Sequence, residues 1–160
     1  MGKILIVYYT RTGNTERMAR LVEKGARQEG AEVVVQSVQE TKPEDLLKYD
    51  ALIFGSPTYY GTMAHGFKRL IDTGVDFHGQ LEGKVGAAFS SSANIGGGNE
   101  STVLSLLQAF LIHGMVVQGD PEGDHYGPVS VGEPDERAAI QCERLGLRVA
   151  RLVRQLKGED

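Results

Sequence analysis

The 160-residue chain lacks tryptophan, has a single cysteine and contains no long apolar run. The lone Cys142 excludes an internal disulfide and a metal cage built from cysteines, which fits a reducing, cytoplasmic setting. The longest apolar runs are as short as Ile4–Val7, whereas a transmembrane helix needs about 20 residues. The chain begins with a strand-like run and shows no small-residue cleavage site, so we expect neither membrane insertion nor a secretory signal.

The chain also lacks an excess of positive charge. Its 17 basic and 21 acidic residues give a net charge of −4, which argues against a nucleic-acid partner because such proteins normally carry a basic patch. The same charge is small for a carrier that docks its partners through a negative surface alone. A hydrophobic share of 41% is ordinary for a globular protein and excludes disorder. The length predicts one domain over residues 1–160.

Strand-like and helix-like segments alternate along the chain. Lys3–Tyr9 is a continuous apolar run, typical of a strand buried on both faces, and Asn14–Glu29 has apolar or small residues at helical spacing, with Gly30 as a stop. Further strands are predicted at Val33–Val35, Ala51–Gly55, Val85–Ser90 and Met115–Gln118, and helices at Glu44–Lys48, Ala64–Thr73, Glu100–His113 and after Pro134. The last helix is predicted to bury Cys142, Leu145, Val149, Leu152 and Leu156.

This order predicts an α/β fold, a doubly wound five-stranded parallel sheet with helices on both faces, because the connections are too long for hairpins. Such sheets bind ligands at the carboxyl ends of the strands, where the strand order reverses. The loops after the first, third and fourth strands are therefore the candidate functional segments. Gly119–Glu133, rich in glycine, proline and acidic residues, is predicted to be a loop, with Asp120, Glu122 and Asp124 solvated; the alternative is that one of them gates the site.

The loop after the first strand is suited to a phosphate. Thr10–Thr15 (TRTGNT) places hydroxyls and an amide at the start of a helix, where unpaired N–H groups and the helix dipole favour an anion, and Gly13 permits close backbone approach. The alternative is that Asn14 or Thr12 only caps the helix. The segment has neither a nucleoside-triphosphate P-loop nor the G-x-G-x-x-G dinucleotide pattern. A phosphate monoester held mainly by neutral donors is therefore expected.

The other two loops are suited to a flat heterocycle. Tyr59 and Tyr60 lie between glycines after the third strand, and one of them is expected to stack on a ring while the other supports it. The alternative is packing on the protein's own surface or at a subunit interface. After the fourth strand, Gly96–Gly98 exposes backbone N–H groups, with serines and Asn94 nearby; the alternative there is a flexible loop. No catalytic nucleophile and no metal-ligand spacing is present.

With these loops in place, the chain resembles the flavodoxin-like FMN-binding superfamily, whose T-x-T-G-N-T phosphate loop Thr10–Thr15 matches. Within it, the chain is most similar to NAD(P)H:quinone oxidoreductases of the tryptophan-repressor-binding-protein type. The segments that carry this resemblance are Gly55–Met63, Phe89–Thr102, His113–Val117 and Tyr126-Gly127. The resemblance implies a flavodoxin-like sheet of strand order 2-1-3-4-5 and an FMN cofactor that carries the chemistry, so no catalytic residue is expected.

The resemblance also implies roles for particular residues. The FMN phosphate would be held by Thr10, Arg11, Thr12, Gly13, Asn14 and Thr15. The isoalloxazine would lie along Pro57, Thr58, Tyr59, Tyr60 and Gly61. Its pyrimidine edge and the ribityl chain would contact Ser91, Ser92, Asn94, Gly96 and Gly97, and Tyr126 would close the far side.

Two functions follow from the resemblance. The leading one is two-electron reduction of quinones or similar small acceptors, with NAD(P)H as a transient donor. The alternative is a flavodoxin that carries single electrons between redox protein partners; a non-redox binding module ranks last. The chain departs from the quinone reductases in a shortened segment before Tyr126 and in Ile112-His113, where the family tends to have paired histidines. His113 is expected to interact favourably with a helix dipole. A dimer or tetramer stays open.

Overall fold

The computed structural model describes residues 1–159 and contains one parallel sheet in the order β2-β1-β3-β4-β5. The strands are β1 Lys3–Tyr8, β2 Glu32–Ser37, β3 Ala51–Pro57, β4 Val85–Ser92, β5 Val116–Val117 and β6 Val129–Val131. The helices are α1 Asn14–Gln28, α2 His65–Thr73, α3 Asn99–Ile112 and α4 Glu136–Leu156, with short 3₁₀ helices η1 Val38–Glu40, η2 Pro43–Lys48 and η3 Val75–Phe77. The predicted fold class and strand order are confirmed.

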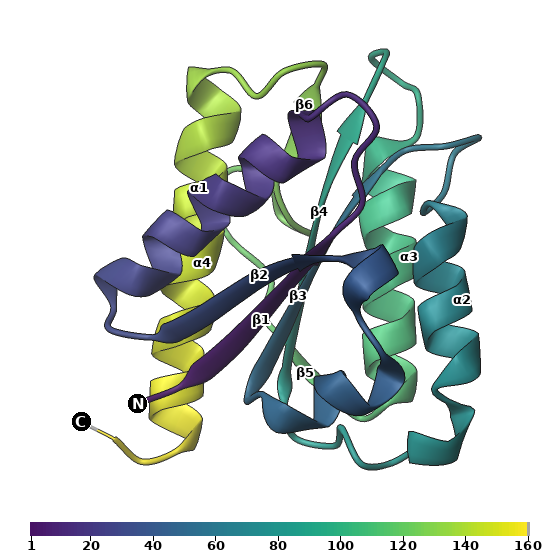
Figure 1. Ribbon diagram of the computed structural model, residues 1–160. Helices are drawn as coiled ribbons and strands as arrows, with labels where there is room; N and C mark the ends of the chain where they lie inside the picture. Colours follow the sequence, from purple (N-terminus) through teal and green to yellow (C-terminus); the bar gives the residue numbers. More distant parts are fainter. Residues whose placement is uncertain (160) are drawn as a thin grey trace.

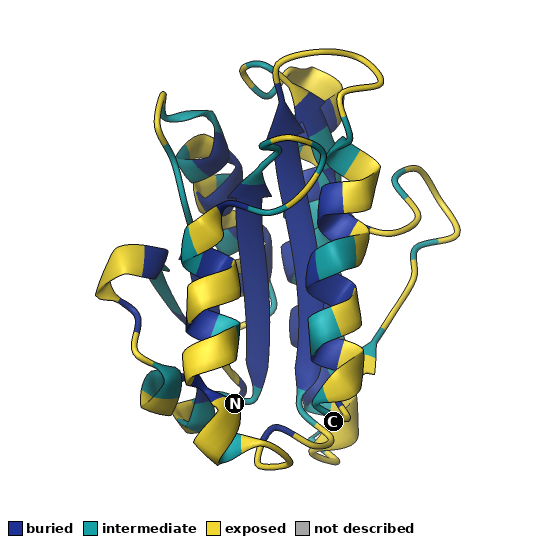
Figure 2. Ribbon diagram, turned by 90° about the vertical axis from the view of Figure 1, so that its right-hand side faces the viewer, coloured by how far each residue is buried: buried dark blue, intermediate teal, exposed yellow. Residues whose placement is uncertain are grey.

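The sheet lies between two helix layers (Figure 1). Because successive side chains of a strand point to opposite faces, Ile4 and Ile6 pack with α1 and α4, whereas Leu5 and Val7 pack with α2 and α3. Figure 2 shows the strands buried and the outer faces of the helices exposed. A run of apolar residues without alternation is therefore what a sheet covered on both sides requires. No helix within residues 1–159 is long and apolar enough to cross a membrane.

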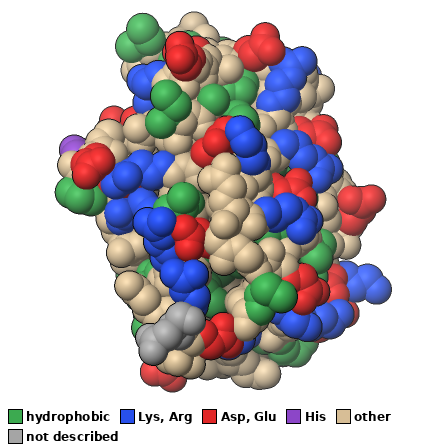
Figure 3. Space-filling model, turned by 90° about the vertical axis from the view of Figure 1, so that its left-hand side faces the viewer, with side chains coloured by type: hydrophobic (Ala, Val, Ile, Leu, Met, Phe, Trp, Pro, Cys, Tyr) green, Lys and Arg blue, Asp and Glu red, His purple; other side chains and the backbone are tan. Residues whose placement is uncertain are grey.

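Two glycines bring α1 and α4 into close contact. A side-chain Cβ at Gly25 would lie 1.9 Å from the Glu143 carbonyl oxygen, and one at Gly146 would lie 2.0 Å from that of Val22. The exposed sides of these helices are joined by ion pairs, including Lys24–Glu143 at 2.7 Å. Figure 3, which views the molecule from this side, shows basic and acidic side chains interleaved across the surface.

The far edge of the sheet differs from the prediction. β5 pairs only with Val85 and Gly86 and leaves the carboxyl half of β4 without β5 as a neighbour. β6 takes that place and pairs with Ser90–Ser92. The prediction that Gly119–Glu133 is entirely a loop is therefore wrong at Val129–Val131. The short strand was missed because its signal is three residues long in a segment rich in glycine and proline.

The acidic residues before β6 are not all solvated, contrary to the prediction. Asp120 accepts hydrogen bonds from the Arg144 guanidinium at 2.6 and 2.9 Å, and these bonds lower its pKa to about 2. Asp124 is paired with Arg137 at 2.8 Å. These contacts anchor the segment to α4, because each joins residues that are far apart in the sequence.

Two predictions about helix ends also need correction. Leu156 does not belong to the buried stripe of α4, since its side chain is 54% exposed in the last turn. His113 follows the last residue of α3, as expected, but burial and the nearby His78 lower the pKa of its imidazole, which disfavours the charged form that a helix dipole would attract. The ring centroids of the two histidines are 5.7 Å apart.

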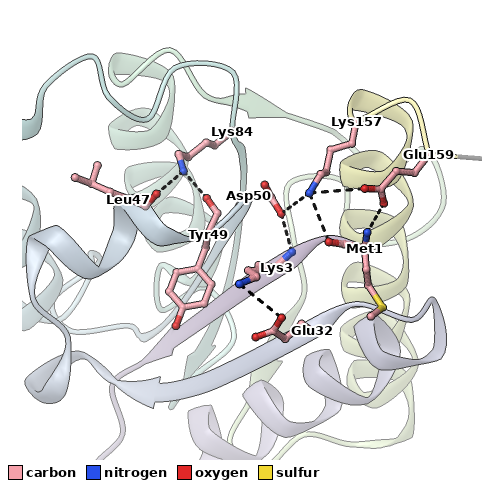
Figure 4. Close-up of polar contacts among 9 residues, drawn as sticks. All are labelled: Met1, Lys3, Glu32, Leu47, Tyr49, Asp50, Lys84, Lys157 and Glu159. Atoms are coloured by element: carbon pink, nitrogen blue, oxygen red, sulfur yellow. Dashed lines mark hydrogen bonds and ion pairs between the residues drawn. The ribbon is translucent and has the colours of Figure 1, made fainter.

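The amino-terminal edge of the sheet is tied together by polar contacts (Figure 4). Asp50, just before β3, accepts hydrogen bonds from the backbone N–H of Lys3 at 2.8 Å and from the Lys157 ammonium at 3.2 Å. The Lys84 ammonium donates to the backbone carbonyls of Leu47 and Tyr49, and burial lowers its pKa. The chain termini lie at this edge, so the opposite edge, where the strands end, is formed by loops (Figure 1).

Candidate functional site

The candidate site lies at the carboxyl ends of β1 and β3. The chain passes from β1 to β2 on one side and then returns to β3 on the other, so the strand order reverses between β1 and β3. A crevice at such a point is where open parallel sheets bind ligands. The loops after β1, β3 and β4 gather at this edge, at the top of Figure 1.

The loop after β1 leads into α1, whose first turn has no side-chain cap. Gly13 occupies the cap position of α1 with φ 94°, a left-handed backbone that favours glycine. The alternative that Asn14 or Thr12 caps the helix is therefore wrong: Thr10 instead accepts a hydrogen bond from the Gly13 N–H at 2.9 Å. Within residues 1–159, the N–H groups that open α1 at Asn14, Thr15 and Glu16 have no acceptor. Together with the dipole, these donors fit an anion.

Hydroxyl groups connect the three loops beneath this edge. Thr15 is 1% exposed, and its hydroxyl shares a hydrogen bond of 2.9 Å with that of Ser91 at the end of β4. Thr58 shares one of 3.0 Å with Ser90 and accepts one of 3.1 Å from Thr102 on α3. Buried hydroxyls that are satisfied in this way fix the loops relative to one another. Ser90 and Thr102 were not predicted as site residues, because each is recognised only through its partner in another segment.

The second loop is a tight turn that presents aromatic rings. Tyr59 and Thr62 exchange backbone hydrogen bonds, with positive φ at Tyr60 (49°) and Gly61 (80°), the signature of a type I′ turn. Tyr60 at the tip is fully exposed, whereas Tyr59 is half-buried. Of the two rings, that of Tyr60 is therefore the one accessible to a ligand.

Tyr59 rests against Tyr9, the residue that follows β1. Their ring centroids lie 5.9 Å apart with an angle of 86° between the planes, and burial followed by the nearby Tyr9 raises the pKa of the Tyr59 phenol. Such edge-to-face pairs are favourable aromatic contacts. Tyr9 was not singled out from the sequence, because its position at the end of a buried strand suggested a core residue.

The third loop touches the second. A Cβ at Gly98 would lie 2.8 Å from the Gly61 Cα atom, and the Ser101 hydroxyl donates to the Gly61 carbonyl at 2.7 Å. The Ser92 hydroxyl donates to the Asn94 carbonyl at 3.0 Å and accepts from the Asn99 amide at 3.1 Å. The glycine-rich loop is thus held at both ends, while Gly96 and Gly97 between them are exposed.

One predicted residue lies apart from the rest. Tyr126 is 53% exposed and lines a different pocket, with Gln141 and Leu145 of α4. The reason is that Gly127 packs against the Ala88 carbonyl, in the middle of β4, and β6 takes the place next to the end of that strand. The remaining predicted residues lie in the three loops described above or at the strand ends that lead into them.

Three residues noted in the sequence, Cys142, Ile112 and His113, do not contribute to these loops. Cys142 is fully buried, and desolvation raises the pKa of its thiol to about 12, so it is not a nucleophile at neutral pH. Ile112 and His113 lie at the end of α3 next to the start of β5, at the opposite edge of the sheet. Within this chain they do not face the three loops.

Comparison with known proteins agrees with this geometry. The model of the flavodoxin family matches residues 6–108. The chain belongs to the flavodoxin family. It is 45% identical to a flavodoxin of Aquifex aeolicus, with 96% of this chain and 88% of that protein covered. It is 38% identical to an NAD(P)H dehydrogenase (quinone) of Archaeoglobus fulgidus, with 98% and 100% covered.

Solved structures show the same fold. A flavodoxin, WrbA-like protein from Agrobacterium tumefaciens superposes with a TM-score of 0.80 at 28% identity, covering 97% of this chain and 99% of that one. A flavodoxin from the domain Archaea gives 0.78 at 27% identity, with 95% and 99% covered. Membership of the flavodoxin family implies an FMN cofactor. The open N–H groups of α1 and the surrounding hydroxyls fit its phosphate, so the chain is an FMN redox flavoprotein.

Proposed function

We propose that this flavodoxin-family protein catalyses the transfer of two electrons from NADH or NADPH to a quinone or a similar small acceptor. The proposal depends on FMN binding. The main support for FMN binding is the uncapped start of α1, which lies where the strand order reverses. FMN held at this site would supply the hydride-transfer chemistry by which NAD(P)H, a proton and a quinone give NAD(P)⁺ and a hydroquinone.

The protein's own residues bind and orient the cofactor. The hydroxyls of Thr10, Thr12 and Thr15, the Asn14 amide and the N–H groups around Gly13 would hold the phosphate, with Arg11 adding positive charge. The turn from Pro57 to Gly61 would flank the isoalloxazine, with the exposed Tyr60 ring over it. Ser91, Ser92, Asn94, Gly96 and Gly97 would contact the polar edge. Tyr126 lines a different pocket and is left out of this proposal.

The distribution of charge supports an enzyme rather than a carrier. A carrier that docks a positively charged partner needs unpaired carboxylates around its cofactor. Near the first loop, Glu133 is paired with Arg17 at 2.7 Å and Glu16 accepts from the Tyr8 hydroxyl at 3.2 Å. Arg11, in the loop itself, is exposed. Glu100, in the first turn of α3, is exposed and forms no ion pair within residues 1–159, but the first loop itself carries no carboxylate.

The alternative is a carrier of single electrons between proteins. The 45% identity to a flavodoxin and the fully exposed Tyr60 ring, which a partner protein can contact, favour it. The two functions differ in whether a reduced nicotinamide reacts directly with the bound cofactor.

Anaerobic mixing of the FMN-loaded protein with NADH or NADPH separates the two functions. We expect the oxidised flavin absorbance to bleach and to return when a quinone is added. A flavin that both nucleotides leave oxidised, but that a flavodoxin reductase reduces, would overturn the enzyme and support the carrier. Failure to bind FMN would overturn both.

A further inference from the structure

We infer that a groove next to the FMN edge binds the phosphate groups of the nucleotide donor. The groove has a volume of about 320 Å³ and is lined by polar groups from two segments that are distant in the sequence. Gln39 and Lys42 come from the segment after β2, and His65 and Arg69 come from α2. This inference rests on the proposed function, because it assigns a place to the donor.

The first observation is that the groove gathers two cations that form no ion pair within residues 1–159. Of the 17 lysines and arginines, all but Arg11, Lys42, Arg69 and Lys84 form ion pairs within residues 1–159. Lys84 donates to two backbone carbonyls instead. Arg11 belongs to the loop assigned to the FMN phosphate. The two that remain, Lys42 and Arg69, both line the groove.

The second observation is that the carboxylates next to the groove are already engaged. Glu40 accepts from the Ser37 hydroxyl at 2.8 Å. Asp45 is paired with Lys48 at 2.7 Å, and Asp72 with Lys68 at 2.8 Å. Glu44 is exposed and does not line the groove. In a chain of net charge −4, two unpaired cations facing one hollow indicate a site for an external anion.

The third observation is that the groove is continuous with the candidate FMN site. Tyr9 lines the groove, and its ring lies near the rings of both Tyr59 and His65, at centroid separations of 5.9 and 6.2 Å. Gly66 lets α2 lie close to η1 here, since a Cβ at that position would come within 2.9 Å of Val38. A ligand with a flat ring at the flavin and an anionic tail therefore fits across Tyr9, and a nicotinamide dinucleotide has this form.

A charge-matched pair of variants tests the inference. K42Q/R69Q removes the two groove cations, and K48Q/K68Q removes two paired lysines nearby, Lys48 in η2 and Lys68 in α2. Calorimetry of ADP binding to the FMN-loaded protein, with adenosine as the phosphate-free control, reads out the groove without turnover. We expect K42Q/R69Q to weaken ADP binding at least about tenfold, and K48Q/K68Q to change it by less than about twofold. Equal ADP affinity in both variants would overturn the inference.

Reduction kinetics then separate the groove from the proposed function. The KM for NADH or NADPH is expected to rise about tenfold in K42Q/R69Q only, whereas reduction by 1-benzyl-1,4-dihydronicotinamide, which has no phosphate, stays unchanged. If the nucleotides and the benzyl compound all leave the wild-type flavin oxidised, the proposed function is wrong, as is the assignment of the groove to a donor. If the nucleotides reduce the wild type and K42Q/R69Q equally well, the function holds and the groove inference fails.

Discussion

Replacing Gly98 by alanine tests whether the close approach of two loops builds the cofactor site. Gly98 has φ 103°, and the added Cβ would lie 2.8 Å from the Gly61 Cα atom, whereas an ordinary contact is 3.4–4 Å. The turn that carries Tyr60 would therefore have to move by at least about 0.6 Å. A left-handed backbone costs alanine about 1–2 kcal/mol, and overpacking adds about 1–3 kcal/mol. We expect a loss of about 2–5 kcal/mol in the free energy of unfolding.

Gly30→Ala is the matched control. Gly30 has φ 78°, no atom lies within 4 Å of its added Cβ, and it follows α1 at the edge of the sheet away from the three loops. It should lose only the backbone cost of about 1–2 kcal/mol and keep its FMN affinity. Urea unfolding gives the free energies, and quenching of flavin fluorescence gives the FMN Kd. We expect Gly98→Ala to raise that Kd about tenfold to a hundredfold, because small displacements of binding groups are costly. Equal effects of the two substitutions would refute the role of this contact.

Three further outcomes are expected. Thr15→Val removes the hydroxyl that meets Ser91 and should raise the FMN Kd about tenfold, whereas Thr41→Val, another buried threonine whose hydroxyl is bonded within the chain, should leave the Kd unchanged in the same titration. The Arg144 guanidinium lowers the pKa of Asp120 in the folded protein to about 2, from an ordinary 3.8. The ionised Asp120 therefore contributes fully to stability above pH 3.8, and this contribution is lost as the pH falls towards 2. Asp120→Asn should flatten the dependence of the unfolding free energy on pH in that window, and an unchanged pH profile would contradict the ion pair. Burial raises the pKa of the Cys142 thiol to about 12, so a thiol reagent at pH 8 should label it only in denaturant, and rapid labelling of the native protein would disprove its burial.

The alternation of strands and helices can be predicted from short segments of the sequence. The continuous apolar run of β1 and the helical spacing of α1 each report burial through the residues of one segment, so both were predicted with bounds close to those observed. The loop that we propose holds the phosphate was predicted for the same reason, since its hydroxyls, glycine and amide are consecutive residues. Sheet order followed from the family resemblance.

Other features depend on contacts between distant segments. β6 forms next to the half of β4 that β5 does not reach. The residues Val129–Val131 alone give no sign of this pairing. Asp120 was predicted to be solvated, but in the structure Arg144 of α4 lies next to it and donates a hydrogen bond to it. Tyr126 was grouped with the cofactor loops by its place in the chain, yet the packing of Gly127 on Ala88 moves it to another pocket.

The sequence by itself therefore determined the fold class and predicted the loop that we propose holds the FMN phosphate, because local burial patterns and one contiguous motif carry them; FMN itself followed from the family resemblance. Only the tertiary structure decided which charges are neutralised. The groove cations Lys42 and Arg69 look like any other exposed basic residues in the sequence. They are distinguished because the carboxylates nearby are bonded elsewhere, and that pairing depends on how three separate segments pack.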